Sequence, residues 1–275
     1  MSAETPPQAT ASSATDAIVE AVHVRAGYGD NVILSDVTFD IERGSIVTLC
    51  GGSGCGKSTA LRTLTGMLEP MAGEVRLFGE SIVDADEGRK NELLRRTGVM
   101  FQHGALLGSL TLAENVALPL KEHTSLSDRV IRRVVEAKLA LVGLGHALDR
   151  LPSEVSGGML KRAGVARAIA LDPELLFCDE PSAGLDPIVA AGLDHTLRQL
   201  QRELGMTIIV VTHELASIEI IADQVVMLDA GEVLAHGTVD ELKHSDIEKV
   251  REFFARTAPH DERGETSLLD ALEAP

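Results

Sequence analysis

A glycine-rich segment, from Gly51 to Ser58, has the residue types and spacing of a phosphate-binding loop. It reads Gly-Gly-Ser-Gly-Cys-Gly-Lys-Ser, a full match to the pattern G-x-x-x-x-G-K-[ST]. Glycines at these positions let the loop wrap so that backbone N–H groups point inward at phosphate oxygens. A helix that follows directly adds its positive N-terminal end. At an average glycine usage of roughly 7%, a chance match has odds on the order of one in a hundred.

Different residues of this loop are expected to bind the nucleotide and its metal ion. Lys57 would reach the β- and γ-phosphates of ATP, and the Ser58 hydroxyl would be a ligand of Mg²⁺. The other positions expected to line the bound nucleotide are Gly51, Ser53, Gly54, Cys55, Gly56 and Thr59.

Two adjacent carboxylates, Asp179 and Glu180, follow a short apolar run at Leu175–Cys178. A buried strand that ends in carboxylates delivers them to the carboxyl edge of a sheet, where bound phosphates would lie. Asp179 would hold Mg²⁺, directly or through water, and Glu180 could polarise the attacking water as a general base. Apolar strands that end in Asp-Glu are common, so this pattern is specific only together with the phosphate loop.

A Ser-Gly-Gly segment, Ser156 to Gly158, stands shortly before the Asp179 strand and opens an expected helix. It could be a second anion-binding helix start or an ordinary turn with a helix cap. These residues alone leave both interpretations open.

The elements that must position these residues alternate between apolar strands and helices. Ile46–Cys50, Leu175–Cys178 and Thr207–Val211 are continuous apolar runs, and a helix is expected over Lys57–Leu68. Continuous apolar strands separated by helices indicate a parallel sheet covered on both faces.

Two further regions differ from this pattern. Ile18–Ile41 alternates and contains glycines, which favours an antiparallel sheet, whereas residues 103–165 look helical, with a clear apolar period over Ser127–Val142. The expected fold class is α/β, a P-loop NTPase parallel sheet core with an N-terminal antiparallel β subdomain and an inserted helical subdomain. The expected division is a disordered leader at 1–16, one ATPase domain at 17–258 and an acidic tail at 259–275.

Composition excludes several classes of protein. The net charge is −17, from 42 acidic against 25 basic residues, which argues against a nucleic-acid partner. No apolar run is long enough for a membrane-spanning helix, and the N-terminus lacks the features of a signal peptide. The three cysteines form neither a metal-ligand spacing nor an even disulfide set, which fits reducing, cytosolic surroundings.

The order of these motifs resembles the nucleotide-binding subunits of ABC transporters, over about residues 18–242. The residues that carry the resemblance are the phosphate loop, Gln102, Ser156–Gly158, Asp179, Glu180, Ser182–Asp186 and His213. The resemblance implies that two copies pack head to tail, with each ATP between the phosphate loop of one copy and the Ser-Gly-Gly segment of the other. Ser156 and Gly158 would then touch the γ-phosphate across the interface, Gly157 would belong to the same nucleotide-binding segment, and Asp186 would couple the two sites.

The resemblance also implies roles for three isolated residues. Gln102 would sense Mg²⁺ and the attacking water while facing a membrane partner, and His213 would contact the γ-phosphate. Tyr28 would stack on adenine, although its Gly-Tyr-Gly segment could equally be a turn with a packed ring. The chain departs from the family pattern at Val155 and Met159, where Leu and Gln are frequent, and neither change removes a phosphate donor.

Several stretches narrow the resemblance to the MCE-associated, Mla-type ATPases of bacterial phospholipid transport. These stretches are 101–107, 109–116, 119–120, 156–162, 186–188 and 250–254. The implied partners are a permease dimer, a hexameric MCE-domain protein and, in some relatives, a small STAS-domain subunit. The chain would then be a peripheral protein on the cytoplasmic face of the inner membrane.

Three other classes of protein compete with this interpretation. Soluble ATPases of DNA repair or chromosome structure share the motifs but insert a long coiled coil, and only about fifty residues separate Gln102 from Ser156 here. Translation-associated relatives carry two ATPase units in one chain, and this chain has one. An ABC importer ATPase for a polar small solute, such as an amino acid, remains the closer alternative.

Overall fold

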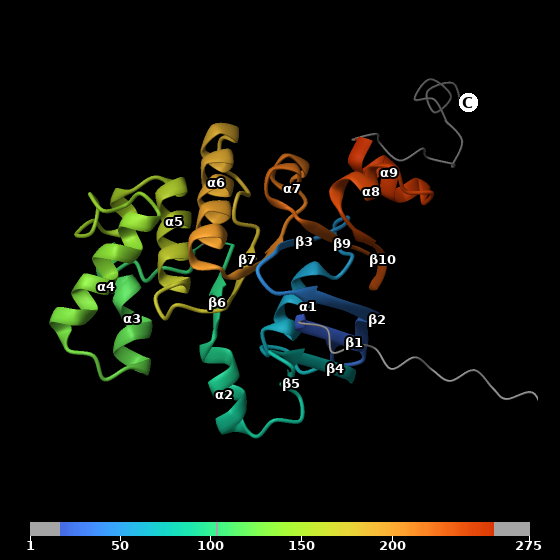
Figure 1. Cartoon of the computed structure of the whole chain (residues 1–275), viewed down its shortest axis with the longest axis horizontal. Coiled ribbons are helices and arrows are strands. Elements are labelled where there is room, and N and C mark those ends of the chain that lie inside the picture. Colours follow the sequence, from blue (N-terminus) through green and yellow to red (C-terminus); the bar gives the residue numbers. More distant parts are fainter. Residues whose placement is uncertain (1–16, 103, 256–275) are drawn as a thin grey trace, which may run out of the picture.

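A computed structural model describes residues 17–102 and 104–255 (Figure 1). The strands are β1 (Ala17–Tyr28), β2 (Asn31–Glu42), β3 (Ile46–Cys50), β4 (Ala72–Leu77), β5 (Glu80–Ser81), β6 (Thr97–Met100), β7 (Leu175–Asp179), β8 (Thr207–Val211), β9 (Gln224–Asp229) and β10 (Glu232–Gly237). The helices are α1 (Lys57–Leu64), α2 (Glu87–Arg95), α3 (Leu112–His123), α4 (Asp128–Leu141), the 3-10 turn η1 (Pro152–Glu154), α5 (Gly157–Ala168), α6 (Pro187–Leu204), α7 (Leu215–Ile221), α8 (Val239–Lys243) and α9 (Glu248–Ala255). The expected leader at 1–16 and acidic tail at 259–275 lie outside the described residues.

The described strands form one mixed sheet in the order β5-β4-β1-β2-β10-β9-β3-β8-β7-β6. Strands β9, β3, β8, β7 and β6 are parallel neighbours, and β1, β2, β4 and β5 pair antiparallel. The expected parallel core and the expected antiparallel segment are both confirmed. Strand β10 has no counterpart among the expected elements. It pairs antiparallel with β9 and meets β2 at Glu232 and Asp36, so it joins the two parts into one sheet.

Helices cover both faces of the parallel strands, which is why β3, β7 and β8 are mostly apolar along their length. In β3, Val47 and Leu49 face the cluster that contains Leu61 and Leu64 of α1. Ile46 of the same strand faces the cluster formed with α3, α4, α5 and α6. A strand buried on both sides has no solvent-facing residue to break its apolar run.

Helix α1 ends at Leu64 and not at the expected Leu68. Gly66 has a φ of 69°, a left-handed conformation that does not continue a right-handed helix. The N–H groups of Met67 and Leu68 both bind the carbonyl oxygen of Arg62. The apolar residues after Leu64 therefore belong to a closing turn, and the expected helix end was wrong.

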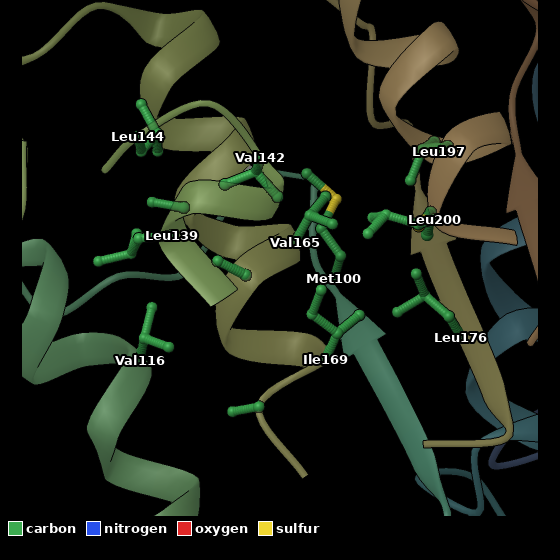
Figure 2. Close-up of a cluster of buried hydrophobic side chains, with 14 of the residues drawn as sticks. Met100, Val116, Leu139, Val142, Leu144, Val165, Ile169, Leu176, Leu197 and Leu200 are labelled. Carbon is green, nitrogen blue, oxygen red and sulfur yellow. The ribbon is translucent and has the colours of Figure 1, made fainter. Parts of the chain in front are cut away.

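Helices α3, α4 and α5 lie side by side at one end of the molecule (Figure 1). Figure 2 shows the buried cluster that joins them to α6 and to the sheet, with Met100, Val116, Leu139, Val142, Leu144, Val165, Ile169, Leu176, Leu197 and Leu200 labelled. The helix expected over Ser127–Val142 is confirmed as α4, although Val130 on its outer face is 39% exposed. Within 17–102 and 104–255, no helix is long and apolar enough to cross a membrane.

Candidate active site

Four parallel strands end at one edge of the sheet and bring most of the expected site residues there. Met100 of β6 lies opposite Cys178 of β7. Asp179 of β7 lies opposite Val211 of β8, which in turn lies opposite Leu49 of β3. The carboxyl ends of neighbouring parallel strands form one edge, the usual ligand site of such sheets. The expected site residues that follow or end these strands are Gly51–Ser58, Gln102, Asp179, Glu180 and His213.

The phosphate loop follows β3 in a wrap that only glycine allows at two positions. Gly51 has a φ of 139°, and a Cβ atom there would lie 2.2 Å from the carbonyl oxygen of Leu228. Gly56 has a φ of 109°, and its Cβ would lie 2.5 Å from a methyl carbon of Leu34. Side chains at these positions would be strained and would clash with β9 and β2. The loop conformation is therefore fixed by its own glycines and by the strands beside it.

The loop leads directly into the N-terminus of α1, which is open toward an anion. Gly56 caps the helix without a side chain, and the first turn carries no acidic residue. The first N–H groups of a helix lack intrahelical partners and carry its positive dipole end. The Lys57 ammonium group donates hydrogen bonds to the carbonyl oxygens of Gly51 and Gly52, each at 2.9 Å. Ser58 is exposed beside it, whereas Thr59 is buried. These groups together can bind a chain of phosphates.

Glu180 is held from three directions and keeps one carboxylate oxygen free. Its N–H donates to the carbonyl oxygen of Val211, and its own carbonyl oxygen accepts from the Lys161 ammonium group, both at 2.8 Å. Its Oε1 atom lies 2.8 Å from Nδ1 of His213. The side chain is 13% exposed, and among the described residues its buried Oε2 atom has no hydrogen-bond partner. A carboxylate fixed at one oxygen and free at the other can accept a proton from a water molecule.

His213 follows β8 and lies against Glu180, so the structure brings these two expected catalytic residues together. Its side chain is more than half exposed, with Nε2 at 3.8 Å from an oxygen of Glu214. When Glu180 is ionised, Nδ1 carries the proton and donates it in the hydrogen bond. The imidazole then orients the carboxylate from the solvent side.

The Ser-Gly-Gly segment forms the start of α5, away from the phosphate loop of the same chain. Ser156 is the N-cap, and its hydroxyl oxygen accepts from the N–H of Met159 at 3.3 Å. A Cβ atom on Gly158 would lie 2.5 Å from a methyl carbon of Val189, so α5 and α6 approach closely there. Helix α5 packs against α3, α4, α6 and β6, whereas α1 packs against β1, β2, β7 and β8 (Figure 1). Gly157 and Ser156 are exposed, and the Ser156 hydroxyl still has its proton to donate.

Three further expected site residues lie at the margins of this edge. Asp186 is the N-cap of α6, and its Oδ1 atom accepts from the N–H of Ile188 at 2.9 Å. Tyr28 ends β1, and its hydroxyl accepts from Arg62 of α1 at 2.7 Å, so the ring stands near the helix that follows the phosphate loop. Gln102 is exposed two residues beyond the end of β6.

Asp194 of α6 is a buried carboxylate that the sequence analysis did not single out. It is 1% exposed, and its two oxygens accept from the hydroxyls of Ser182 at 2.9 Å and Ser217 at 2.7 Å. Burial raises the pKa of Asp194, and the two serine hydrogen bonds oppose that shift. Ser182 lies shortly after Glu180 in the chain, and Ser217 lies shortly after His213. The Asp194 carboxylate therefore links the two segments that contain the catalytic pair. The signal in the sequence was an acidic residue on the apolar face of α6.

Comparisons with known proteins agree with this geometry. Residues 34–183 match the sequence model of the family described as ABC transporter. The probable ribonucleotide transport ATP-binding protein mkl of Mycobacterium leprae (strain TN) is 40% identical over 235 residues, which are 86% of this chain and 68% of that protein. The intermembrane phospholipid transport system ATP-binding protein MlaF of Haemophilus influenzae is 38% identical over 236 residues, 86% of this chain and 89% of that protein.

A solved structure shares the fold. It is a dimeric ATP-binding cassette in a post-hydrolysis state bound to ADP and Pi, with a TM-score of 0.73 and 29% identity, over 80% of this chain and 98% of that one. The family match alone spans more than half of the 275 residues and includes the phosphate loop, the Ser-Gly-Gly segment, Asp179 and Glu180. The chain belongs to the ABC transporter family and carries its nucleotide-binding ATPase domain.

Proposed function

We propose that two copies of this chain hydrolyse ATP between them and thereby power phospholipid movement across a bacterial envelope. The observation that carries the proposal is the match to MlaF, which extends over 89% of that protein at 38% identity. The arrangement of the active site supports the ATPase step, and the relative's name supports the cargo.

In the proposed reaction, Glu180 accepts a proton from water that attacks the γ-phosphate. Its free Oε2 atom is the acceptor, while His213 holds Oε1 and contacts the γ-phosphate. Lys57 exchanges its two carbonyl partners for phosphate oxygens. The N–H groups of the loop and of the first turn of α1 bind the remaining phosphate oxygens. Gln102, just beyond the end of β6, contacts the attacking water. These groups stabilise charge that moves onto the phosphates during the reaction.

The site also fits Mg²⁺. Ser58 and Asp179 supply hard oxygen ligands at one edge of the sheet. Gln102 follows β6, the strand next to the one that ends in Asp179. Mg²⁺ is usually held by one or two protein oxygens together with phosphates and water. Residues 17–102 and 104–255 hold no group of three or more His, Cys, Asp or Glu that could bind a metal ion. When bound, Mg²⁺ would neutralise charge on the β- and γ-phosphates.

The proposed dimer places the Ser-Gly-Gly segment of one copy on ATP bound by the other. Exposure of Ser156 and Gly157, with a hydroxyl proton still available, supports this role. Ile188, the second residue of α6 after its N-cap Asp186, is 84% exposed, which suits a residue buried by a second copy. The solved relative that matches this chain is itself dimeric.

A groove beside Gln102 is the proposed docking surface for the permease. It has a volume of about 520 Å³, and its lining includes Arg95, Phe101, Pro119, His123 and Arg167. Phe101 precedes Gln102, so a protein segment seated in the groove would reach the active-site edge.

We further propose an MCE-domain protein beyond the permease and a STAS-domain subunit as partners. The chain, with its ATPase domain at 17–258, would lie on the cytoplasmic face of the inner membrane and bind no nucleic acid.

The relatives' names differ in cargo, since mkl is named for ribonucleotides and MlaF for phospholipid. Affinity isolation of this chain from its native membrane, with proteins and lipids identified by mass spectrometry, separates the two. We expect recovery of a permease, an MCE-domain protein and phospholipid. Recovery of a small-solute permease without an MCE protein would leave the ATPase assignment intact and contradict the lipid assignment.

A further inference from the structure

Lys161, about one turn into α5, is a buried lysine bound by a backbone carbonyl group. It is 8% exposed, and its Nζ atom donates to the carbonyl oxygen of Glu180 at 2.8 Å. Burial lowers the pKa of Lys161, and the charges of Glu180 and Asp179 oppose that shift. Burying an ammonium group is unfavourable, so packing alone does not account for a lysine at this position.

The carbonyl group that Lys161 holds belongs to a residue in an uncommon backbone conformation. Glu180 has a φ of 45°, in the left-handed region that residues with side chains seldom adopt. Val211 of β8 fixes the peptide plane before its Cα atom, and Lys161 fixes the plane after it. These two planes set the direction in which the Glu180 carboxylate leaves the backbone. The N–H of Ala183 also reaches the Glu180 carbonyl oxygen, at a longer 3.3 Å.

Helix α5 connects Lys161 to the Ser-Gly-Gly segment without a break. Ser156 caps the helix and Gly157 begins it, so Lys161 lies little more than one turn further along. Val165, on a later turn, and Ile169, the C-cap, pack into the cluster of Figure 2. Because Ser156 and Lys161 share one continuous helix, a displacement of the helix start would also move Lys161.

We propose that Lys161 is a positioning residue that links the two ATP sites of the dimer. When the Ser-Gly-Gly segment closes on ATP held by the partner copy, α5 moves the Lys161 ammonium group. The hydrogen bond from Lys161 then moves the carbonyl group of Glu180. Alignment of the carboxylate in one site then depends on closure of the other. This inference rests on the proposed head-to-tail dimer.

Two substitutions separate this role from a structural one. Lys161→Met removes the donor and keeps a similar side-chain length, so kcat should fall about tenfold to a hundredfold, the cost of a small misplacement of a catalytic group. KM for ATP should stay unchanged because the phosphate loop is untouched. Lys161→Gln, which keeps an N–H donor, should recover part of kcat. Lys138→Met is the matched control, because Lys138 is 6% exposed and bonded to Asp172 away from the site.

Mixed dimers of two differently tagged copies show which site Lys161 serves. One copy carries Glu180→Gln, so only the other can hydrolyse its ATP. Lys161→Met should slow hydrolysis when it stands in the copy with the intact Glu180, and have little effect when it stands in the Glu180→Gln copy. An unchanged kcat, an equal loss in both arrangements, or the same loss with Lys138→Met would overturn the inference. A wild-type chain that hydrolyses no ATP would instead contradict the proposed function.

Discussion

The Glu180→Gln variant is expected to bind ATP as the wild type does and to hydrolyse it about a hundredfold to ten-thousandfold more slowly, the usual contribution of a general base. Glutamine keeps the size of the side chain and an oxygen that can accept from His213. It has no carboxylate oxygen to take the proton from water at the position of Oε2. Phosphate release under saturating ATP measures the loss.

The same variant should accumulate as an ATP-bound dimer, because closure no longer ends in hydrolysis. Light scattering after size-exclusion chromatography, with and without ATP, measures this change of mass. Glu214→Gln is the matched control, since Glu214 lies next in the chain to His213 but is far more exposed than Glu180. Rapid hydrolysis by Glu180→Gln, or an equal loss in Glu214→Gln, would mean that another group is the base.

Lys57→Ala should weaken ATP binding itself. The ammonium group makes charge-assisted hydrogen bonds worth about 1.5–3 kcal/mol, so its loss corresponds to a decrease in affinity of about tenfold to a hundredfold. The lysine already stands at the loop, 2.9 Å from the carbonyl oxygens of Gly51 and Gly52, and needs only to exchange these partners for phosphate. Titration with a fluorescent ATP analogue measures the dissociation constant.

Lys90→Ala controls for the loss of one positive charge, because Lys90 belongs to α2, outside the phosphate loop. It should bind ATP as the wild type does. Circular dichroism of both variants checks that the fold is kept. Unchanged affinity in Lys57→Ala would count against the assignment of Gly51–Ser58 as the nucleotide site.

The parts of the fold that depend on local pattern could be predicted from the sequence. The apolar runs of β3, β7 and β8 are continuous because both faces of these strands are buried, and periodicity located α4. Strand β6, with only four residues, and β10 gave no such signal. The role of β10 depends on its single pairing with β2, a contact between distant segments that no local pattern encodes.

The candidate site follows the same division. The residues of the phosphate loop, Asp179 and Glu180 were found because their spacing is itself the requirement of phosphate chemistry. The left-handed backbone conformation of Glu180 could not be predicted, because such a conformation is expected from sequence mainly at glycine. Lys161 lies within the stretch 156–162 but received no role from the sequence, and its contact with Glu180 arises only when α5 packs against the sheet at β6. Asp194 likewise acquires its partners from two other segments.

The central claim, that ATP hydrolysis by this chain moves phospholipid, is tested most directly with the isolated complex in liposomes that contain a fluorescent phospholipid. ATP should drive movement of the labelled lipid in the complex with wild-type chain, and the complex with Glu180→Gln should bind ATP and move none. Lipid movement of equal rate without ATP or with Glu180→Gln, or ATP hydrolysis that moves no lipid, would contradict the account.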